Sequence, residues 1–115
     1  MRYLLLIYTE ETTAAPDPAE AEKVMNDYWA YTSAVKEAGI NQGSEALQDS
    51  TTATTVRVKD GERVVTDGPF AETREVLGGY YLIDVPDLDA AIDWAAKCPG
   101  AQHGSVEVRP IMEFS

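Results

Sequence analysis

The most unusual stretch of the chain is residues 66–75, which read Thr-Asp-Gly-Pro-Phe-Ala-Glu-Thr-Arg-Glu. Gly68 accepts backbone angles that other residues avoid, and Pro69 fixes its own φ angle, so the loop is stiff. A stiff loop that holds a carboxylate beside an aromatic ring is a common wall of a small-molecule pocket. The pattern predicts such a pocket, with Asp67 as an acid/base group or polar anchor and Phe70 as an apolar wall. The alternative is an Asx-turn at Asp67 with Phe70 in the core.

His103 is the one histidine of the chain and a weaker catalytic candidate. A reference pKa of about 6.5 suits a general base, but a position in a surface loop explains the residue equally. No cysteine or histidine stands near it at the spacing of zinc ligands, so we expect no metal site and no cofactor. Cys98 closes an apolar helix stripe, which favours a buried packing role over a nucleophile.

Arg57 and Tyr81 extend the expected ligand pocket. Residues 51–75 carry five acidic and four basic side chains, whereas the whole chain has a net charge of -11, so charges nearly balance here. Arg57 and Arg74 would bind a carboxylate ligand near the loop. The alternative is that both pair with Glu62, Glu72 and Glu75 on an exposed face. Tyr81 lies on an apolar strand and offers either a pocket hydroxyl or a core ring.

Local signals predict the elements that position these residues. Asp17 and Pro18 are an N-cap and a first helical residue, Gly39 is a left-handed helix stop, and Asp60-Gly61 is a type I′ turn signal. In chain order we expect a strand at 2–8, a helix from 18 to about 38, an edge strand at 44–48, a hairpin of 52–59 with 62–66, a strand at 80–85, a helix at 88–98 and a strand at 105–111. The glycines at 78 and 79 indicate a close backbone approach at a strand start, without the context of a phosphate-binding loop.

This order predicts an α+β sandwich of the ferredoxin-like type, with two helices on one face of an antiparallel sheet. The runs 2–8 and 80–85 are apolar on both strand faces. Two helices cover one face, so the other needs a second cover, and an identical sheet supplies it. We therefore expect a homodimer, packed sheet to sheet into an α+β barrel.

Length and composition exclude several classes of protein. The chain has 115 residues, of which 44% are hydrophobic, which fits a single domain spanning 1–115. Its net charge of -11 argues against binding nucleic acid, which requires basic side chains on phosphates. No run is long enough to cross a membrane and the N-terminus does not read as a secretory signal. One cysteine cannot form an internal disulfide, so we expect a cytoplasmic protein.

The Asp-Gly-Pro-Phe motif at 67–70, the following Ala-Glu-Thr-Arg-Glu and the run Leu-Gly-Gly-Tyr-Tyr-Leu-Ile-Asp-Val at 77–85 carry a family resemblance. Matching segments also lie at 2–8, 53–57, 88–99 and 104–110. On these residues the chain strongly resembles the YCII-related family, and within it the subgroup named after the DGPF motif. The resemblance implies a dimeric α+β barrel over nearly the whole chain.

The resemblance has several functional implications. Some YCII-like relatives use a first-helix histidine with an aspartate, and a few break down aromatic or chlorinated lactone-type compounds, which points to lyase- or isomerase-like chemistry. Here residues 26–29 read Asn-Asp-Tyr-Trp and hold no histidine, whereas Asp67 matches the subgroup motif. Subgroup members are typically encoded beside extracytoplasmic-function sigma factors, so a non-catalytic regulatory partner of such a factor is the alternative function.

Overall fold

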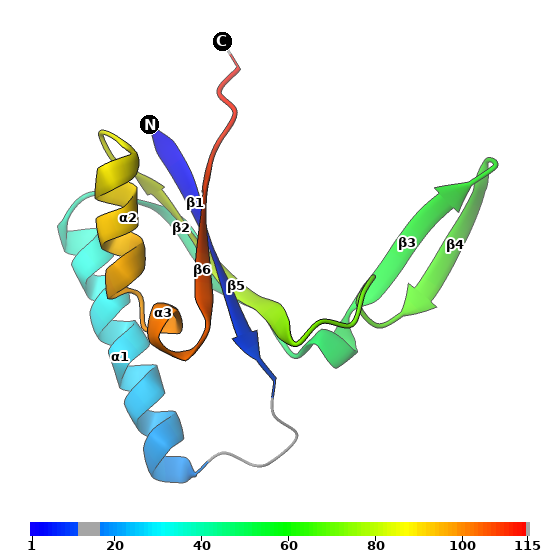
Figure 1. Ribbon diagram of the computed structural model, residues 1–115, viewed down its shortest axis with the longest axis horizontal. Helices are drawn as coiled ribbons and strands as arrows, with labels where there is room; N and C mark the ends of the chain where they lie inside the picture. The colour runs from blue at the N-terminus through cyan, green and yellow to red at the C-terminus, as the bar shows by residue number, and fades with distance from the viewer. Residues whose placement is uncertain (12–16, 115) are drawn as a thin grey trace.

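A computed structural model describes residues 1–11 and 17–114 of the chain. The described part contains one four-stranded sheet, one two-stranded hairpin, two main helices and two short helical segments (Figure 1). The elements are β1 (Arg2–Glu10), α1 (Pro18–Glu37), β2 (Asn41–Ala46), the 3-10 turn η1 (Ser50–Thr52), β3 (Thr54–Lys59), β4 (Glu62–Asp67), β5 (Glu75–Asp84), α2 (Leu88–Lys97), α3 (Gly100–His103) and β6 (Ser105–Pro110).

The main sheet has the strand order β2-β5-β1-β6, and every neighbouring pair is antiparallel. With the β3–β4 hairpin set aside, the chain runs strand, helix, strand, strand, helix, strand, which is the ferredoxin-like pattern. The expected α+β class, antiparallel sheet and pair of main helices are therefore confirmed.

The capping residues read from the sequence begin both main helices. The Asp17 carboxylate accepts a hydrogen bond from the Ala19 N–H at 3.2 Å, and the Asp87 carboxylate accepts one from the Ala90 N–H at 2.9 Å. Each bond satisfies a donor that the first turn of a helix leaves free. Past the end of α1, Gly39 has a φ angle of 74°, the left-handed conformation expected of a helix stop.

Both main helices lie on one side of the sheet, and the core fills the layer between them (Figure 1). Alternate β1 residues Tyr3, Leu5 and Ile7 point into this layer and are buried. They pack with buried side chains from α1, β5 and the segment around α2: Tyr31, Val35, Tyr81, Ile83, Val85, Ala91, Ala95 and Cys98. Burial raises the pKa of the Cys98 thiol, so this residue is the inert packing group that its apolar stripe predicts.

The other sheet face is apolar at its centre and has no helix over it (Figure 1). Register pairs Leu4 with Leu82 and Leu6 with Tyr80, so these four side chains share one face, opposite the buried residues of β1 and β5. All four are partly buried. The prediction that both central strands are apolar on both faces is thus confirmed, and we call Leu4, Leu6, Tyr80 and Leu82 the open-face cluster.

The hairpin β3–β4 projects from the body as a separate arm (Figure 1). Its two strands pair with each other from Thr54↔Asp67 to Lys59↔Glu62 and belong to no larger sheet. Asp60 and Gly61 at the tip have φ angles of 52° and 79°, which is the type I′ geometry predicted from the Asp-Gly pair.

The main differences from the sequence expectation concern β2, β5 and residues 100–103. The edge strand β2 begins at Asn41 rather than at 44, and β5 begins at Glu75, inside the expected loop. Residues 100–103 form the short helix α3 instead of a loop, because Gly100 lies against Ile7 and Tyr28 so closely that a Cβ there would sit 2.5 Å from Ile7 Cγ2. Among the described residues, no helix is long and apolar enough to span a membrane.

Candidate functional site

A groove of about 800 Å³ lies between α1 and the sheet. This volume lies within the range of about 300–1,000 Å³ typical of small-molecule sites. We call it the α1 groove. It is lined by Ile7 and Thr9 of β1, by Glu20, Ala21, Val24, Met25, Tyr28, Trp29, Thr32 and Lys36 of α1, by Ser44, Glu45 and Ala46 of β2, and by Gly78, Gly79, Tyr80 and Tyr81 of β5.

Gly78 and Gly79 leave one wall of the groove without side chains. A Cβ on Gly79 would stand 2.8 Å from the Glu45 carbonyl oxygen, so the close approach of β2 to β5 requires glycine there. This confirms the close backbone approach for Gly79 of the two residues for which it was predicted. At Gly78 the nearest atom to an added Cβ, Thr9 Oγ1, is 3.9 Å away, an ordinary van der Waals contact, so a side chain fits there. Met25 and Trp29 of α1 are 56% and 65% exposed and form the apolar rim.

A pair of hydroxyl groups lies in this groove. Thr32 Oγ1 and Tyr81 Oη are 2.7 Å apart and share a hydrogen bond. The Tyr81 ring is held edge-on against Tyr31, with ring centroids 5.0 Å apart, and the Tyr31 hydroxyl donates to the Trp94 carbonyl at 2.8 Å. These contacts hold the ring of Tyr81 against α1, so its hydroxyl is presented to the groove in a set direction.

Tyr28 and Tyr81 of the groove remain protonated at neutral pH. Burial raises the pKa of Tyr28 to about 12. Burial also raises the pKa of Tyr81, although the hydrogen bond from Thr32 opposes the shift. A protonated phenol donates a hydrogen bond and is a poor general base, so these groups suit the binding of an acceptor oxygen.

Three charged residues also line the groove: Glu20 and Lys36 of α1 and Glu45 of β2. Lys36 offers three donors on a flexible stem and would face an anionic end of a ligand. Across residues 1–11 and 17–114, no cluster of three or more His, Cys, Asp or Glu side chains could hold a metal ion.

The residues predicted to form a pocket around Asp67 lie at the base of the arm instead. The Gly68 N–H donates to the Ala53 carbonyl at 2.7 Å and Thr55 Oγ1 donates to the Gly68 carbonyl at 2.8 Å, so the loop with Pro69 is anchored as expected. The φ angle of Gly68 is 96°, which a residue with a side chain adopts rarely. Phe70 is 78% exposed, so its alternative assignment to the core is wrong.

The Asp67 carboxylate is exposed and makes no hydrogen bond to the described residues, so the Asx-turn alternative is not seen either. Neither Asp67 nor Phe70 lines the α1 groove. Arg57 lies exposed in the middle of β3. Arg74 pairs with Glu10 of β1, not with the neighbouring glutamates that the exposed-face alternative required.

His103 ends α3 and is exposed, and it does not line the α1 groove. Of the candidate site residues named from the sequence, Tyr81 lines the α1 groove. His103 and Asp67 do not. The groove residues on α1 were missed because two of them, Val24 and Tyr28, share the three- and four-residue spacing of the apolar stripe that continues with the buried Tyr31 and Val35 and is expected to pack on the core. The signal that could have found them is the pair Met25 and Trp29, which are large and apolar but lie outside that stripe.

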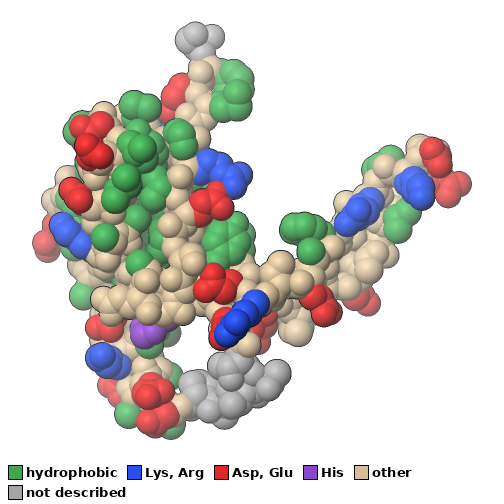
Figure 2. All heavy atoms as spheres, viewed as in Figure 1, with side chains coloured by type: hydrophobic (Ala, Val, Ile, Leu, Met, Phe, Trp, Pro, Cys, Tyr) green, Lys and Arg blue, Asp and Glu red, His purple; other side chains and the backbone are tan. Residues whose placement is uncertain are grey.

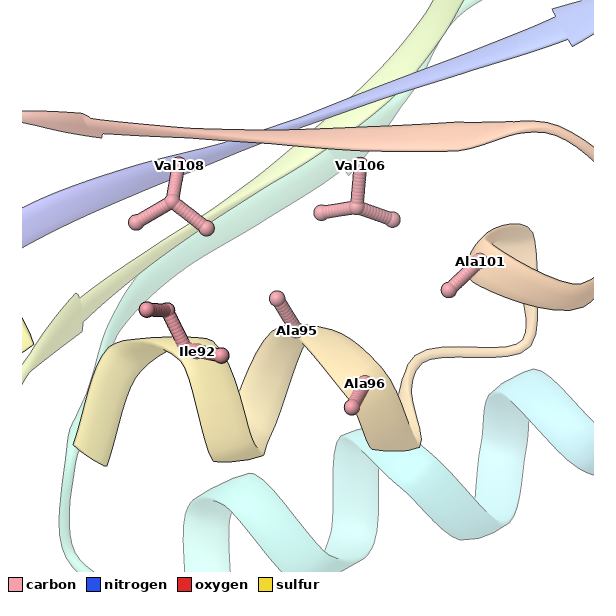
Figure 3. Close-up of a pocket in the computed structure, with 6 residues that line it drawn as sticks. All are labelled: Ile92, Ala95, Ala96, Ala101, Val106 and Val108. Carbon is pink, nitrogen blue, oxygen red and sulfur yellow. The ribbon is translucent and has the colours of Figure 1, made fainter. Parts of the chain in front are cut away.

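A second, smaller hollow of about 290 Å³ lies between α2, α3 and β6 (Figure 3). Val106 and Val108 of β6 point toward Ile92 and Ala95 of α2 across it, and Ala101 of α3 closes one end. The side chains that line it are aliphatic, so it has no group that could bind a polar ligand or transfer a proton.

Comparison with known proteins identifies the family. The model of the YCII-related domain matches residues 1–115, and the chain belongs to this family. It is 44% identical over 114 residues to an uncharacterised protein of Rhizobium meliloti (strain 1021), an alignment that covers 96% of this chain and 92% of the relative. The family resemblance read from the motif-bearing segments is confirmed at this level.

Proposed function

We propose that this chain is a small-molecule-binding protein of the YCII-related family and that its ligand lies in the α1 groove. The observation that carries the proposal is the Thr32–Tyr81 hydroxyl pair in an otherwise largely apolar groove of about 800 Å³. A few fixed polar groups within an apolar lining are the usual composition of a ligand site.

The lining also defines the class of ligand. Tyr28 and Trp29 offer aromatic surface, Tyr81 and Thr32 offer hydroxyl donors, and Lys36 offers a positive charge. These groups suit an aromatic or otherwise flat apolar molecule with an acceptor oxygen or carboxylate at one end. The protonated tyrosines favour binding, and a lyase- or isomerase-like reaction would need a proton acceptor from the ligand itself or from Glu20 or Glu45.

We propose further that a second copy of the chain covers the open-face cluster, giving the sheet-to-sheet dimer and α+β barrel expected from the sequence. A stable soluble protein rarely leaves the apolar centre of a sheet in water. The proposal predicts that Leu6→Lys makes the protein monomeric in light scattering, while Ser33→Lys, which adds the same charge on an exposed α1 position, leaves the dimer intact. A monomeric unmodified protein would contradict it.

The Asp67–Phe70 loop places the chain, in our proposal, in the DGPF-motif subgroup. Because this loop stands at the base of the arm, any pocket built from Asp67, Phe70 and Arg57 would be completed by another copy rather than within one chain. A cytoplasmic location agrees with the buried, free thiol of Cys98.

The ligand proposal is tested with the fluorophore 8-anilinonaphthalene-1-sulfonate, an aromatic anion that matches the lining. We expect saturable binding with one molecule per chain. Gly78→Ile adds a bulky side chain to the groove wall without a backbone clash and should weaken binding at least about tenfold. The control, Ala101→Ile, fills the smaller hollow and should leave binding unchanged. Equal affinity in the two variants would refute the proposal.

A second candidate function is a regulatory partner of an extracytoplasmic-function sigma factor, as the motif subgroup implies. The exposed arm favours it, because a hairpin with free valines and basic side chains is a suitable protein-docking element. Pull-down of the purified cognate sigma factor by the unmodified chain would support this function. Absence of binding at micromolar concentration would contradict it.

A further inference from the structure

The β3–β4 arm is a regular hairpin whose strands pack against no other described element. Every residue of β4 is exposed, as are all residues of β3 except Thr55. An isolated two-stranded hairpin is marginally stable in water at best. We infer that the arm of each copy docks on a second copy of the chain and closes the mouth of that copy's α1 groove, so that the ligand site is complete in the dimer. This inference rests on the proposed function of the groove.

One face of the arm is built for such contact. Cross-strand register places Val56 opposite Val65, and Val58 lies on the same face two residues further along β3. These valines are 57%, 57% and 73% exposed. Arg63 lies on this face too, paired with Val58, whereas the opposite face carries Arg57 and Lys59, paired with Val64 and Glu62. Three of the four arm valines thus share one face, which is the pattern of a strand pair that is covered on one side.

The arm extends on the side of the sheet opposite the helices, where the open-face cluster lies (Figure 1). A second copy covering that cluster would therefore stand beside the arm. Six residues at about 3.3 Å each make the arm about 20 Å long, whereas packed sheets lie about 10 Å apart. The arm thus passes the partner's sheet and reaches the layer between that sheet and its helices, which is where the α1 groove lies.

Charge also favours a second copy of the chain as the molecule on which the arm docks. Residues 54–66 of the arm hold three basic and two acidic side chains, so their net charge is +1. The remaining 102 residues hold six basic and eighteen acidic side chains, so their net charge is -12. Basic side chains stand out along the arm (Figure 2). Arg63, on the valine face of the arm, is complementary to a groove lined by Glu20 and Glu45, whose exposed apolar rim is Met25 and Trp29.

Dimer dissociation tests the docking of the arm. Val58→Glu/Val65→Glu places two carboxylates on the valine face, and we expect the dimer to dissociate at least about tenfold more readily in sedimentation at graded concentrations. Val64→Glu is the matched control, because it adds a carboxylate to the opposite face of the same hairpin. Dimers of equal strength in the double variant and the control would overturn the inference.

The fluorescence of Trp29 tests where the arm docks. In a Trp94→Phe background Trp29 is the single tryptophan, and under a docked arm it should resist quenching by acrylamide. Val58→Glu/Val65→Glu should raise its quenching about threefold, and Val64→Glu should not. Unchanged quenching in the double variant would overturn the inference. Because this measurement needs no ligand, a negative result here with normal fluorophore binding would leave the function of the groove standing.

Discussion

Replacing Tyr81 with phenylalanine removes one hydroxyl from the α1 groove and leaves the ring in place. The edge-on contact with Tyr31, with centroids 5.0 Å apart, involves no hydroxyl of Tyr81 and should survive. The loss is therefore the 2.7 Å hydrogen bond to Thr32. Because both residues line the groove, water can replace the missing partner of Thr32, and the full cost of an orphaned buried group is avoided.

The expected destabilisation is then about 0.5–1.5 kcal/mol, the net worth of an ordinary hydrogen bond. For a domain of this length that corresponds to a fall in Tm of about 4 °C per kcal/mol. Thr32→Val, which removes the other hydroxyl with little change of shape, should cost a similar amount.

Urea unfolding of Tyr81→Phe, Thr32→Val and the double variant measures the bond directly. If one shared hydrogen bond accounts for both effects, the double variant loses little more than either single variant, with a coupling free energy of about 0.5–1.5 kcal/mol. The same variants should each weaken binding of the anilinonaphthalene probe about three- to tenfold. Additive losses of stability, together with unchanged probe affinity, would refute the assignment of this pair as the polar anchor of the groove.

Two further predictions concern packing and ionisation. Gly104→Ala should prevent stable folding, because its Cβ would sit 2.1 Å from the Tyr8 carbonyl oxygen. Gly61→Ala at the arm tip meets no atom, so its left-handed backbone angle alone should lower the free energy of unfolding by about 1–2 kcal/mol. Urea unfolding measures both effects. Similar losses in the two variants would contradict this reasoning. Burial raises the pKa of Tyr28 from 10.0 to about 12, so this tyrosine stabilises the fold fully below pH 10 and the contribution is lost as the pH rises toward about 12. In spectrophotometric titration Tyr28→Phe should remove one late-ionising phenol, and a loss near pH 10 would contradict the assignment.

Local chemistry made much of the fold predictable. The caps Asp17 and Asp87 and the turn Asp60-Gly61 each act through atoms within a few residues of themselves, so sequence determines them almost alone. The double-faced apolar strands were equally clear, because β1 and β5 are central in the sheet. The short helix α3 was missed since contacts of Gly100 with the distant residue Ile7 define it.

The candidate ligand site was harder to predict from the sequence. Phe70 was placed in a pocket or in the core because it is aromatic, yet its loop stands at the base of a projecting arm where one copy provides no cover. The groove depends on which face each strand residue takes, and the register shift between Ile7 and Tyr8 alters that alternation in a way the sequence pattern does not reveal. Tyr81 was selected for its hydroxyl, but its partner Thr32 lies 49 residues away.

The arm enters the chain between two strands, β2 and β5, that already pair with each other as antiparallel neighbours. Residues 47–74 are therefore an insertion into what would otherwise be a simple hairpin connection of the sheet. Since the entropy of closing a loop grows only slowly with its length, such an insertion adds little to the cost of folding the body. The body and the arm can thus vary independently, and a shortened chain that links β2 to β5 by a short loop would retain the four-stranded sheet while losing the arm.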